Sequence, residues 1–497
     1  MTKTILKALA TSALCATAWM AAGAASAAPL SADQRSQIIA SVDAYAPKMN
    51  DAALKIWNNA ELGYMEVKST AVLQDQLKAA GFTIKAGVAG EPTAFVASFK
   101  SGTGPVVAIL AEFDALPGLS QAAVPTRQPV PGRDAGHGCG HNLFGAASVA
   151  SAIAIKNWMV ANKVQGEIRV YGTPAEEGGS GKVYMVRDGL FNDVDVTLNW
   201  HPGNSNSARQ GTSMSNISGK FRFHGQSAHA SGAPWAGRSA LDGVEIMNVA
   251  NNYLREHIPD KTRIHYVITN GGKAPNVVPD FAEVYYYVRN PNPKIVVDVM
   301  ERVKTAAKGA AMITGTTVEF EQTGGVYNLL PNDVLGKVMQ SSLESVGGIT
   351  WTPEELKFAQ QIATTLPNGG GDLSSVGKIQ AYAPADTSGD AAGGSTDVAD
   401  ISWVTPTVGL STATFVPGSA GHSWQNVAAA GMSIGLKGAA VAAKTMSIAG
   451  AELFSNPELI AQAKAELKER QGPGFTYKAM VGDRAPPLDY RKAGGAD

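Results

Sequence analysis

The sequence HGCGHN, at residues 137–142, brings together the residue types that a metal-binding loop needs. It sets Cys139 and His141 among closely spaced glycines. Because glycine lets the backbone turn sharply and approach a ligand closely, both side chains can point at one centre. Thiolate and imidazole ligands favour zinc or another transition ion over calcium or magnesium, which take oxygen ligands. The alternative is a glycine-rich turn that carries polar residues without binding a metal.

The acidic pair Glu176-Glu177, in the sequence TPAEEGG, is the second chemical feature. At the junction of a strand and a turn, one carboxylate can bind a metal while its neighbour faces the adjacent water. A hydrolase uses this arrangement, because one group holds the ion and the other passes a proton to the leaving amine. Most acidic pairs lie in solvated turns. Here glycines follow the pair and an apolar strand pattern precedes it, which favours a functional site.

The elements that must position these residues alternate along the chain. Four apolar runs are typical of buried strands: residues 105–111, 167–172, 194–200 and 405–411. Helix-like segments, such as residues 143–160, follow them. This order predicts an α/β catalytic domain with a mostly parallel sheet that is flanked by helices.

Polar residues follow each of the four runs, at the sheet edge where open α/β folds bind their ligands. They are Glu112 and Asp114, then Glu176 and Glu177, then His201, and finally His422. Together with the glycine-rich loop they supply five potential ligands: Cys139, His141, Glu177, His201 and His422. Five protein ligands exceed one tetrahedral zinc site. The pattern therefore predicts two divalent metal ions, zinc or manganese, with a shared ligand.

Residues 211–325 depart from this alternation. Their pattern predicts a strand, a helix, two strands, a helix and a strand, at residues 213–223, 239–257, 262–269, 282–289, 294–313 and 316–321. This β-α-β-β-α-β order matches a ferredoxin-like α+β unit. We expect it to be a lid or dimerisation domain inserted into a catalytic domain of residues 28–210 and 326–497. A long loop at residues 366–399 is of the kind that is usually functional or mobile.

Residues 1–27 have the pattern of a secretory signal peptide. Lys3 and Lys7 form the charged start, a short apolar stretch follows, and Ala25-Ser26-Ala27 supplies the cleavage pattern. The pattern predicts a periplasmic or secreted protein. The apolar stretch lacks the length and flanks of a permanent membrane span. A net charge of −1 gives no reason to expect nucleic acid as a partner.

Together these motifs resemble the co-catalytic metallo-amidohydrolases and metallopeptidases, which include aminoacylases, glutamate carboxypeptidases and plant auxin-conjugate hydrolases. The sequences that carry the resemblance lie between about residues 38 and 449: EFDALPGLSQ, GHGCGHNLFG, GTPAEEGGSGKVYM, NWHPG, GQSAHASGAPWAGRSALD, NGGKAPNVVP, GGSTDVADISW and PGSAGHSWQ. The resemblance implies that the five potential ligands bind the two ions and that Glu176 is the general base. Where some relatives have a ligating His-x-Asp motif, this chain has Glu112-Phe113-Asp114. We expect Asp114 to orient a ligating histidine.

The resemblance also implies roles for the inserted domain. His229, in GQSAHAS, matches a histidine that polarises the scissile carbonyl, often in the active site of the partner subunit. Asn276 and Arg289 match positions that hold the carboxylate of the substrate, a task that suits the planar guanidinium. Thr396 and Asp397 are expected to complete one wall of the site. Because exposed strand edges are commonly paired, we expect a homodimer.

These features predict an amidohydrolase that cleaves the amide of an N-acyl or N-aroyl amino acid, such as a p-aminobenzoyl-glutamate-like substrate, and releases the free amino acid. A broad aminoacylase or a dipeptidase is the nearest alternative, because nothing in the sequence fixes the acyl pocket. A rival from another class is a periplasmic protein that binds a metal or an amide without turnover. Glu176 argues against this rival, since a pure binding protein needs no spare carboxylate beside the ligand.

Overall fold

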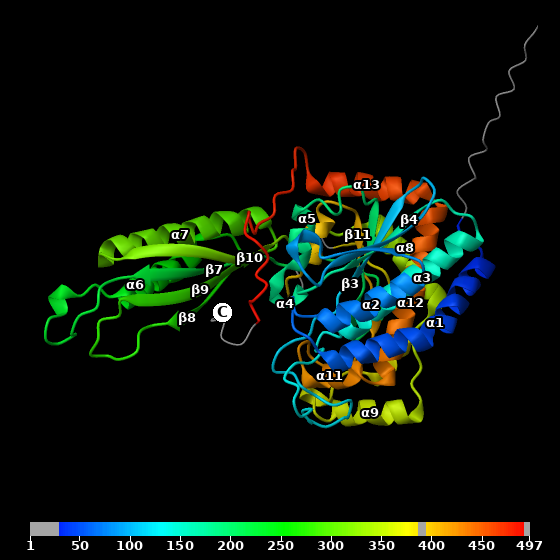
Figure 1. The fold of residues 1–497 in the computed structure, drawn as a ribbon, viewed down its shortest axis with the longest axis horizontal. Helices are drawn as coiled ribbons and strands as arrows, with labels where there is room; N and C mark the ends of the chain where they lie inside the picture. The colour runs from blue at the N-terminus through cyan, green and yellow to red at the C-terminus, as the bar shows by residue number, and fades with distance from the viewer. Residues whose placement is uncertain (1–28, 386–393, 492–497) are drawn as a thin grey trace, which may run out of the picture.

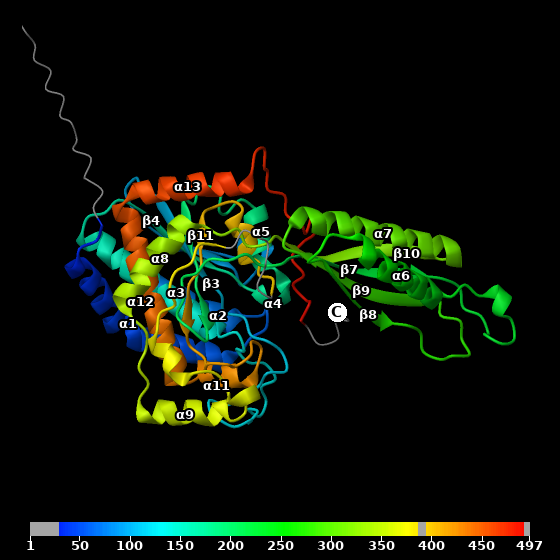
Figure 2. The same cartoon turned by 180° about the vertical axis from the view of Figure 1, so that it is seen from behind.

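The computed structural model describes residues 29–385 and 394–491 (Figure 1). The predicted signal peptide, residues 1–27, lies outside the described residues, as does part of the predicted loop at residues 366–399. A smaller unit, formed by the middle of the chain, projects from one side of a larger one, and the view from behind shows the same arrangement (Figure 2).

The larger unit is built on a six-stranded sheet in the order β1-β2-β4-β3-β5-β11. Its strands are β1 (Thr83–Ala86), β2 (Phe95–Ser101), β3 (Val106–Ala111), β4 (Gly166–Gly172), β5 (Val196–Leu198) and β11 (Thr407–Val408). The last four run parallel to one another, whereas β1 and β2 are antiparallel to their neighbours. Beyond β5 and β11 the chain forms a separate parallel pair, β6 (His201–Gly203) and β12 (Ser411–Ala413).

Helices flank this sheet, which confirms the predicted fold class. α1 (Ala32–Asn59), α3 (His141–Ala161) and α12 (Ser433–Ser455) pack against one another, and α3 also contacts β3 and β4. The remaining helices of this unit are α2 (Val67–Ala79), α4 (Glu176–Gly179), α5 (Gly181–Arg187), α8 (Asp333–Val346), α9 (Pro353–Ala363), α10 (Val398–Ser402), α11 (Trp424–Ala430) and α13 (Pro457–Gln471).

Helix α3 connects the core to the predicted metal loop. It begins at His141, directly after Gly140, which has a φ of +75°. Its residues are almost all buried from His141 to Ile155, because the helix lies between the sheet and its neighbouring helices. By length and apolarity alone α3 could cross a membrane, but most of it is buried inside the protein, as a core helix is.

The smaller unit has the predicted ferredoxin-like order. It consists of β7 (Ser215–His224), α6 (Ala240–Leu254), β8 (Arg263–Asn270), β9 (Phe281–Asn290), α7 (Pro293–Thr314) and β10 (Thr317–Val326). The strands form an antiparallel sheet in the order β10-β7-β9-β8, with β8 at one edge. A separate core around Phe221, Val284 and Val303 joins the sheet to the two helices. We call this unit the inserted domain.

Candidate metal centre

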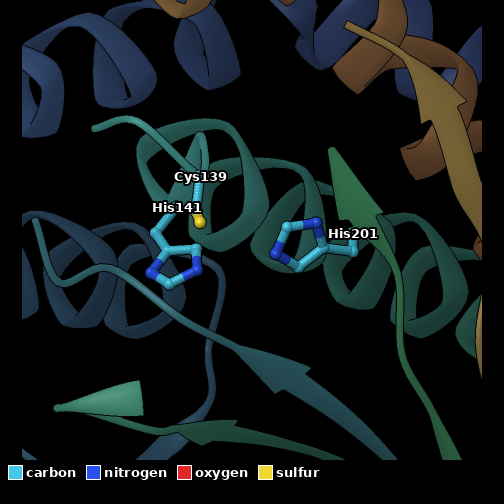
Figure 3. A group of neighbouring side chains, drawn as sticks. All are labelled: Cys139, His141 and His201. Carbon is cyan, nitrogen blue, oxygen red and sulfur yellow. The ribbon is translucent and has the colours of Figure 1, made fainter. Parts of the chain in front are cut away.

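The structure brings the predicted ligands together where the strands of the larger sheet end. Three groups of side chains have ligand atoms within 4.8 Å of one another: Cys139, His141 and His201; Cys139, Glu177 and His422; and His141, Glu176 and Glu177. Figure 3 shows Cys139, in the loop before α3, and His141, at the start of α3, facing His201 at the start of β6. The five predicted ligands and Glu176 therefore form one cluster, and Cys139 belongs to two of its groups.

The backbone of the glycine-rich loop approaches its neighbours closely. A Cβ atom on Gly140 would lie 2.9 Å from Pro202, and one on Gly138 would lie 3.2 Å from the Cα atom of His422. Only glycine leaves enough space for this packing at Gly140. His422 itself has a φ of +56°, a strained conformation for a residue with a side chain and one that is common at functional sites. The close packing brings Cys139 beside two histidine-bearing segments.

Asp114 connects two of the candidate ligands. Its Oδ1 atom lies 2.9 Å from Nδ1 of His141, and its Oδ2 atom accepts a 2.9 Å hydrogen bond from the backbone N–H of Glu177. Burial raises the pKa of Asp114, but His141 and this N–H group outweigh burial and hold the pKa below its ordinary value. A carboxylate on one ring nitrogen fixes the orientation of a ligating histidine. Asp114 therefore has the contact expected of a residue that orients His141.

The other ring nitrogen of His141 faces a carboxylate without a hydrogen bond. Nε2 lies 3.1 Å from Oε2 of Glu112, yet neither of these buried atoms has a hydrogen-bond partner among the described residues, and nor does Oε1 of Glu177. Burial lowers the pKa of His141, but the carboxylates of Asp114 and Glu112 outweigh it and raise the pKa to about 10. The site thus favours positive charge between these groups. A divalent cation fits here, because it would satisfy buried polar atoms that otherwise lack partners.

Neighbouring carboxylates also raise the pKa values of Glu176 and Cys139. Burial, Glu112 and Glu177 raise the pKa of Glu176 well above its ordinary value. Burial and Glu177 raise the pKa of the Cys139 thiol as well. Without a cation, therefore, both groups favour their protonated forms. Cation binding would displace the proton from the thiol, since the thiolate is the form that ligates.

Lys182 is a buried cation that has no role in the sequence prediction. Its Nζ atom lies 2.7 Å from Oε1 of Glu112 and 2.7 Å from Oδ1 of Asp397, and all three side chains are almost fully buried. Its backbone N–H also donates to Asp397. Asp397, which was expected to complete one wall of the site, is buried against Lys182. The only signal for this ion pair in the sequence is a lysine among apolar residues, in GKVYM.

Replacing Lys182 with methionine should lower the free energy of unfolding by about 3–5 kcal/mol, since the carboxylates of Glu112 and Asp397 would stay buried without their cation. Urea unfolding of the variant and the wild type measures this difference. Lys357→Met, at an exposed position, is the control and should change stability by less than about 0.5 kcal/mol. Equal stability of all three proteins would contradict a role for Lys182 in neutralising the buried carboxylates.

Comparison with known proteins identifies the family. Residues 212–313, in the inserted domain, match the family model of the peptidase dimerisation domain. Over 452 residues the chain is 40% identical to one of the subunits of the p-aminobenzoyl-glutamate hydrolase of Escherichia coli, covering 86% of this chain and 93% of that protein. The chain belongs to the M20 peptidase family. As an M20 protein it is a metal-dependent hydrolase that acts on amide bonds. This finding favours an enzyme over the rival binding protein.

Solved structures share its fold. A dinuclear metal binding peptidase of the M20 family from Bacillus subtilis superposes with a TM-score of 0.56 at 17% identity, covering 83% of this chain and 99% of that one. An aminobenzoyl-glutamate utilization protein from Klebsiella pneumoniae superposes with a TM-score of 0.55 at 19% identity, covering 82% and 96%. These likenesses support the architecture of a catalytic unit with an inserted domain.

Three predicted site residues, His229, Asn276 and Arg289, lie in the inserted domain of this M20 chain. The first two lie together, and Arg289 lies elsewhere. His229 is exposed and accepts hydrogen bonds at Nδ1 from the N–H groups of Ser231 and Gly232. Asn276 lies beside it, since its carbonyl accepts a bond from the N–H of Ala230. His229 does not belong to the metal-ligand groups found among the described residues. The backbone pairing of these segments keeps His229 and Asn276 side by side.

Arg289, on β9, lies elsewhere in the inserted domain. Its guanidinium group stands 5.4 Å from the ring centre of Tyr287. The side chain is half-buried, and its Nε atom has no hydrogen-bond partner among the described residues. A partly buried guanidinium whose Nε lacks a partner among the described residues is suited to bind an anionic group of a ligand.

Proposed function

We propose that this M20 chain is a dinuclear-metal amidohydrolase that releases the free amino acid from N-acyl or N-aroyl amino acids. The observation that carries the proposal is the cluster around Glu176. One group consists of Cys139, His141 and His201, and a second consists of Cys139, Glu177 and His422. Each group would hold one ion, zinc or manganese, and Cys139 would be the shared ligand. Bound ions there would polarise the scissile carbonyl and lower the pKa of an attacking water.

The protein's own residues would divide the remaining work. The Glu176 carboxylate lies within 4.8 Å of ligand atoms of Glu177 and His141, so it would be placed to take a proton from water and pass it to the leaving amine. Asp114 would hold His141 and the backbone of Glu177 in place through its two oxygens. Preset contacts of this kind avoid the cost of reorganising the site during the reaction.

We propose a p-aminobenzoyl-glutamate-like compound as the first substrate to test. The support is the 40% identity to a component of a p-aminobenzoyl-glutamate hydrolase over almost its full length. The test is to incubate the metal-loaded protein with p-aminobenzoyl-glutamate, a set of N-acetyl amino acids and a set of dipeptides, and to measure the free amino acids. We expect glutamate to be released from the first compound. Release from dipeptides alone would favour the dipeptidase alternative, and no release from any compound would contradict the proposal.

Arg289 is the residue that we propose for binding the carboxylate of the substrate. Arg289→Lys should raise KM for substrates with a free carboxylate by about 10-fold or more, because an ammonium ion cannot form the bidentate pair. The methyl esters of the same substrates should be almost unaffected. Steady-state kinetics with matched acids and esters measures this contrast. An equal loss for acids and esters would assign Arg289 a structural role instead.

We further propose a periplasmic or secreted homodimer. The location rests on the leader pattern of residues 1–27, and the dimer rests on the match to a peptidase dimerisation domain. His229 and Asn276 belong to the domain that matches a dimerisation domain, and we propose that they serve the active site of the partner subunit.

Mixing two inactive variants tests whether His229 acts in the active site of the partner subunit. His229→Ala and Glu176→Gln proteins, each with little activity, should regain activity when their subunits exchange. Hybrid dimers would then contain one site with both defects and one site with neither. The release of free amino acid is measured before and after the subunits exchange. A tag on one variant verifies the exchange. No recovery after verified exchange would mean that His229 does not act across the interface.

A further inference from the structure

An extended segment follows helix α13. Its residues 472–491, drawn in red in Figures 1 and 2, run between the larger unit and the inserted domain. Because the larger unit carries the metal centre, we call it the catalytic unit. We call this segment the C-terminal strap. None of its residues has a role in the function proposed above.

The first half of the strap is anchored to the catalytic unit. The hydroxyl group of Tyr477 donates a 2.6 Å hydrogen bond to Asp400, a buried residue of α10. Ala479 and Val481 are buried in a small apolar cluster with Val183 and Tyr184 of α5. These contacts fix the strap against the helix that directly follows the Glu176-Glu177 turn.

The middle of the strap is anchored to the inserted domain. The side chain of Gln322, on β10, donates to the carbonyl of Met480, and Arg484 donates to the carbonyl of Thr323. Gly325 leaves the space that Met480 occupies, since a Cβ atom there would lie 2.7 Å from the Cβ atom of Met480. The strap therefore contacts both units along its length.

The last described residues of the strap reach the metal centre. The hydroxyl of Tyr490 and Nη2 of Arg491 each donate a 2.9 Å hydrogen bond to the backbone carbonyl of Glu177. Gly63 makes room for Tyr490, because a Cβ atom at that position would lie 2.3 Å from its hydroxyl oxygen. The Tyr490 ring also packs edge-on against Tyr64, whose hydroxyl donates to the carbonyl of Gly179.

The Glu176-Glu177 turn, which accepts these hydrogen bonds, has a strained backbone that neighbouring contacts must stabilise. Ala175 and Ser180, on either side of it, have φ values of +55° and +57°, and the backbone of Glu177 is not helical. Positive φ costs free energy in residues with a side chain and persists only where surrounding contacts impose it. Two donors on the carbonyl of Glu177 are such contacts.

We propose that the C-terminal strap is part of the active site, in which Tyr490 and Arg491 are positioning residues that fix the Glu177 carbonyl and thereby aim its carboxylate at the metal group. The anchors on β10 connect the inserted domain to the same turn. The inference rests on the proposed function in that Glu177 is a metal ligand. Outer residues that hold a ligand in place typically change metal affinity or activity by about 10- to 100-fold when they are removed.

The test uses the full chain with two substitutions, Tyr490→Phe and Arg491→Met, which remove both donors and leave the strap in place. Binding of Zn²⁺ or Mn²⁺ alone is measured by competition with a chromogenic chelator, and kcat and KM are measured on the metal-loaded protein. We expect metal affinity and kcat each to fall by about 10-fold or more, with KM little changed. Tyr490→Phe combined with Arg491→Lys should recover part of the loss, because lysine retains a donor. Asp489→Asn, a neighbouring exposed strap residue, is the control and should match the wild type.

Wild-type metal affinity and kcat in the double variant would overturn the proposal, and so would a loss confined to KM. The melting temperature of the double variant should stay close to that of the wild type, so that a general loss of folding is detected. The metal-binding measurement needs no substrate. It therefore decides the role of the strap even if the wild type hydrolyses no N-acyl amino acid, which is the outcome that would reject the proposed function.

Discussion

Glu176→Gln should lower kcat by about 10²- to 10⁴-fold, which is the range that a general acid–base group contributes. The amide has nearly the same size as the carboxyl group, but it cannot take a proton from water and return it to the leaving amine. Glu176 lies among carboxylates and is partly shielded from solvent. Steady-state kinetics with the substrate identified in the panel measures the loss.

The metal content of the Glu176→Gln protein should stay close to that of the wild type. Glu177→Gln is the matched variant, one residue along the same turn, and it should lose metal because a neutral amide replaces a ligating carboxylate. Elemental analysis of both proteins after dialysis separates the two roles. If Glu176→Gln lost its metal and Glu177→Gln kept it, the assignments of the two glutamates would be reversed.

The sequence predicted the fold well where local patterns decide it. The parallel strand β3 is a continuous apolar run. The β-α-β-β-α-β order of the inserted domain follows from apolar residues that recur first with the spacing of a strand and then with that of a helix. The antiparallel strands β1 and β2 were not predicted. The burial pattern of β1 is weak because it lies at an edge of the sheet, and apolar alternation is a poor signal for a short edge strand.

The candidate site was predicted to a similar extent. Cys139 and His141 share a motif, and glycine-rich turns identified the loops that carry them. Lys182 was missed, because a buried ion pair depends on which distant carboxylates the fold brings to it, here Glu112 and Asp397. The contacts of Tyr490 and Arg491 with Glu177 were missed for the same reason, since more than 300 residues separate the partners.

Removal of the metal should abolish activity completely. The carboxylates of Asp114 and Glu112 raise the pKa of His141 to about 10 in the absence of a cation, so His141 favours its protonated form in the metal-free site. A protonated imidazole cannot ligate a metal ion, and water without a neighbouring ion is a weak nucleophile. Loss of the ions thus removes both the polarisation of the scissile carbonyl and the activation of the attacking water. We expect this effect to be larger than that of any single substitution.

Titration of the metal-free protein tests the central claim most directly. The protein is stripped with a chelator, dialysed, and supplied with Zn²⁺ or Mn²⁺ in steps while the release of free amino acid is measured. A two-ion site predicts no release at the start and full release after about two equivalents per subunit. Full activity in protein that elemental analysis finds free of metal would contradict a metal-dependent amidohydrolase.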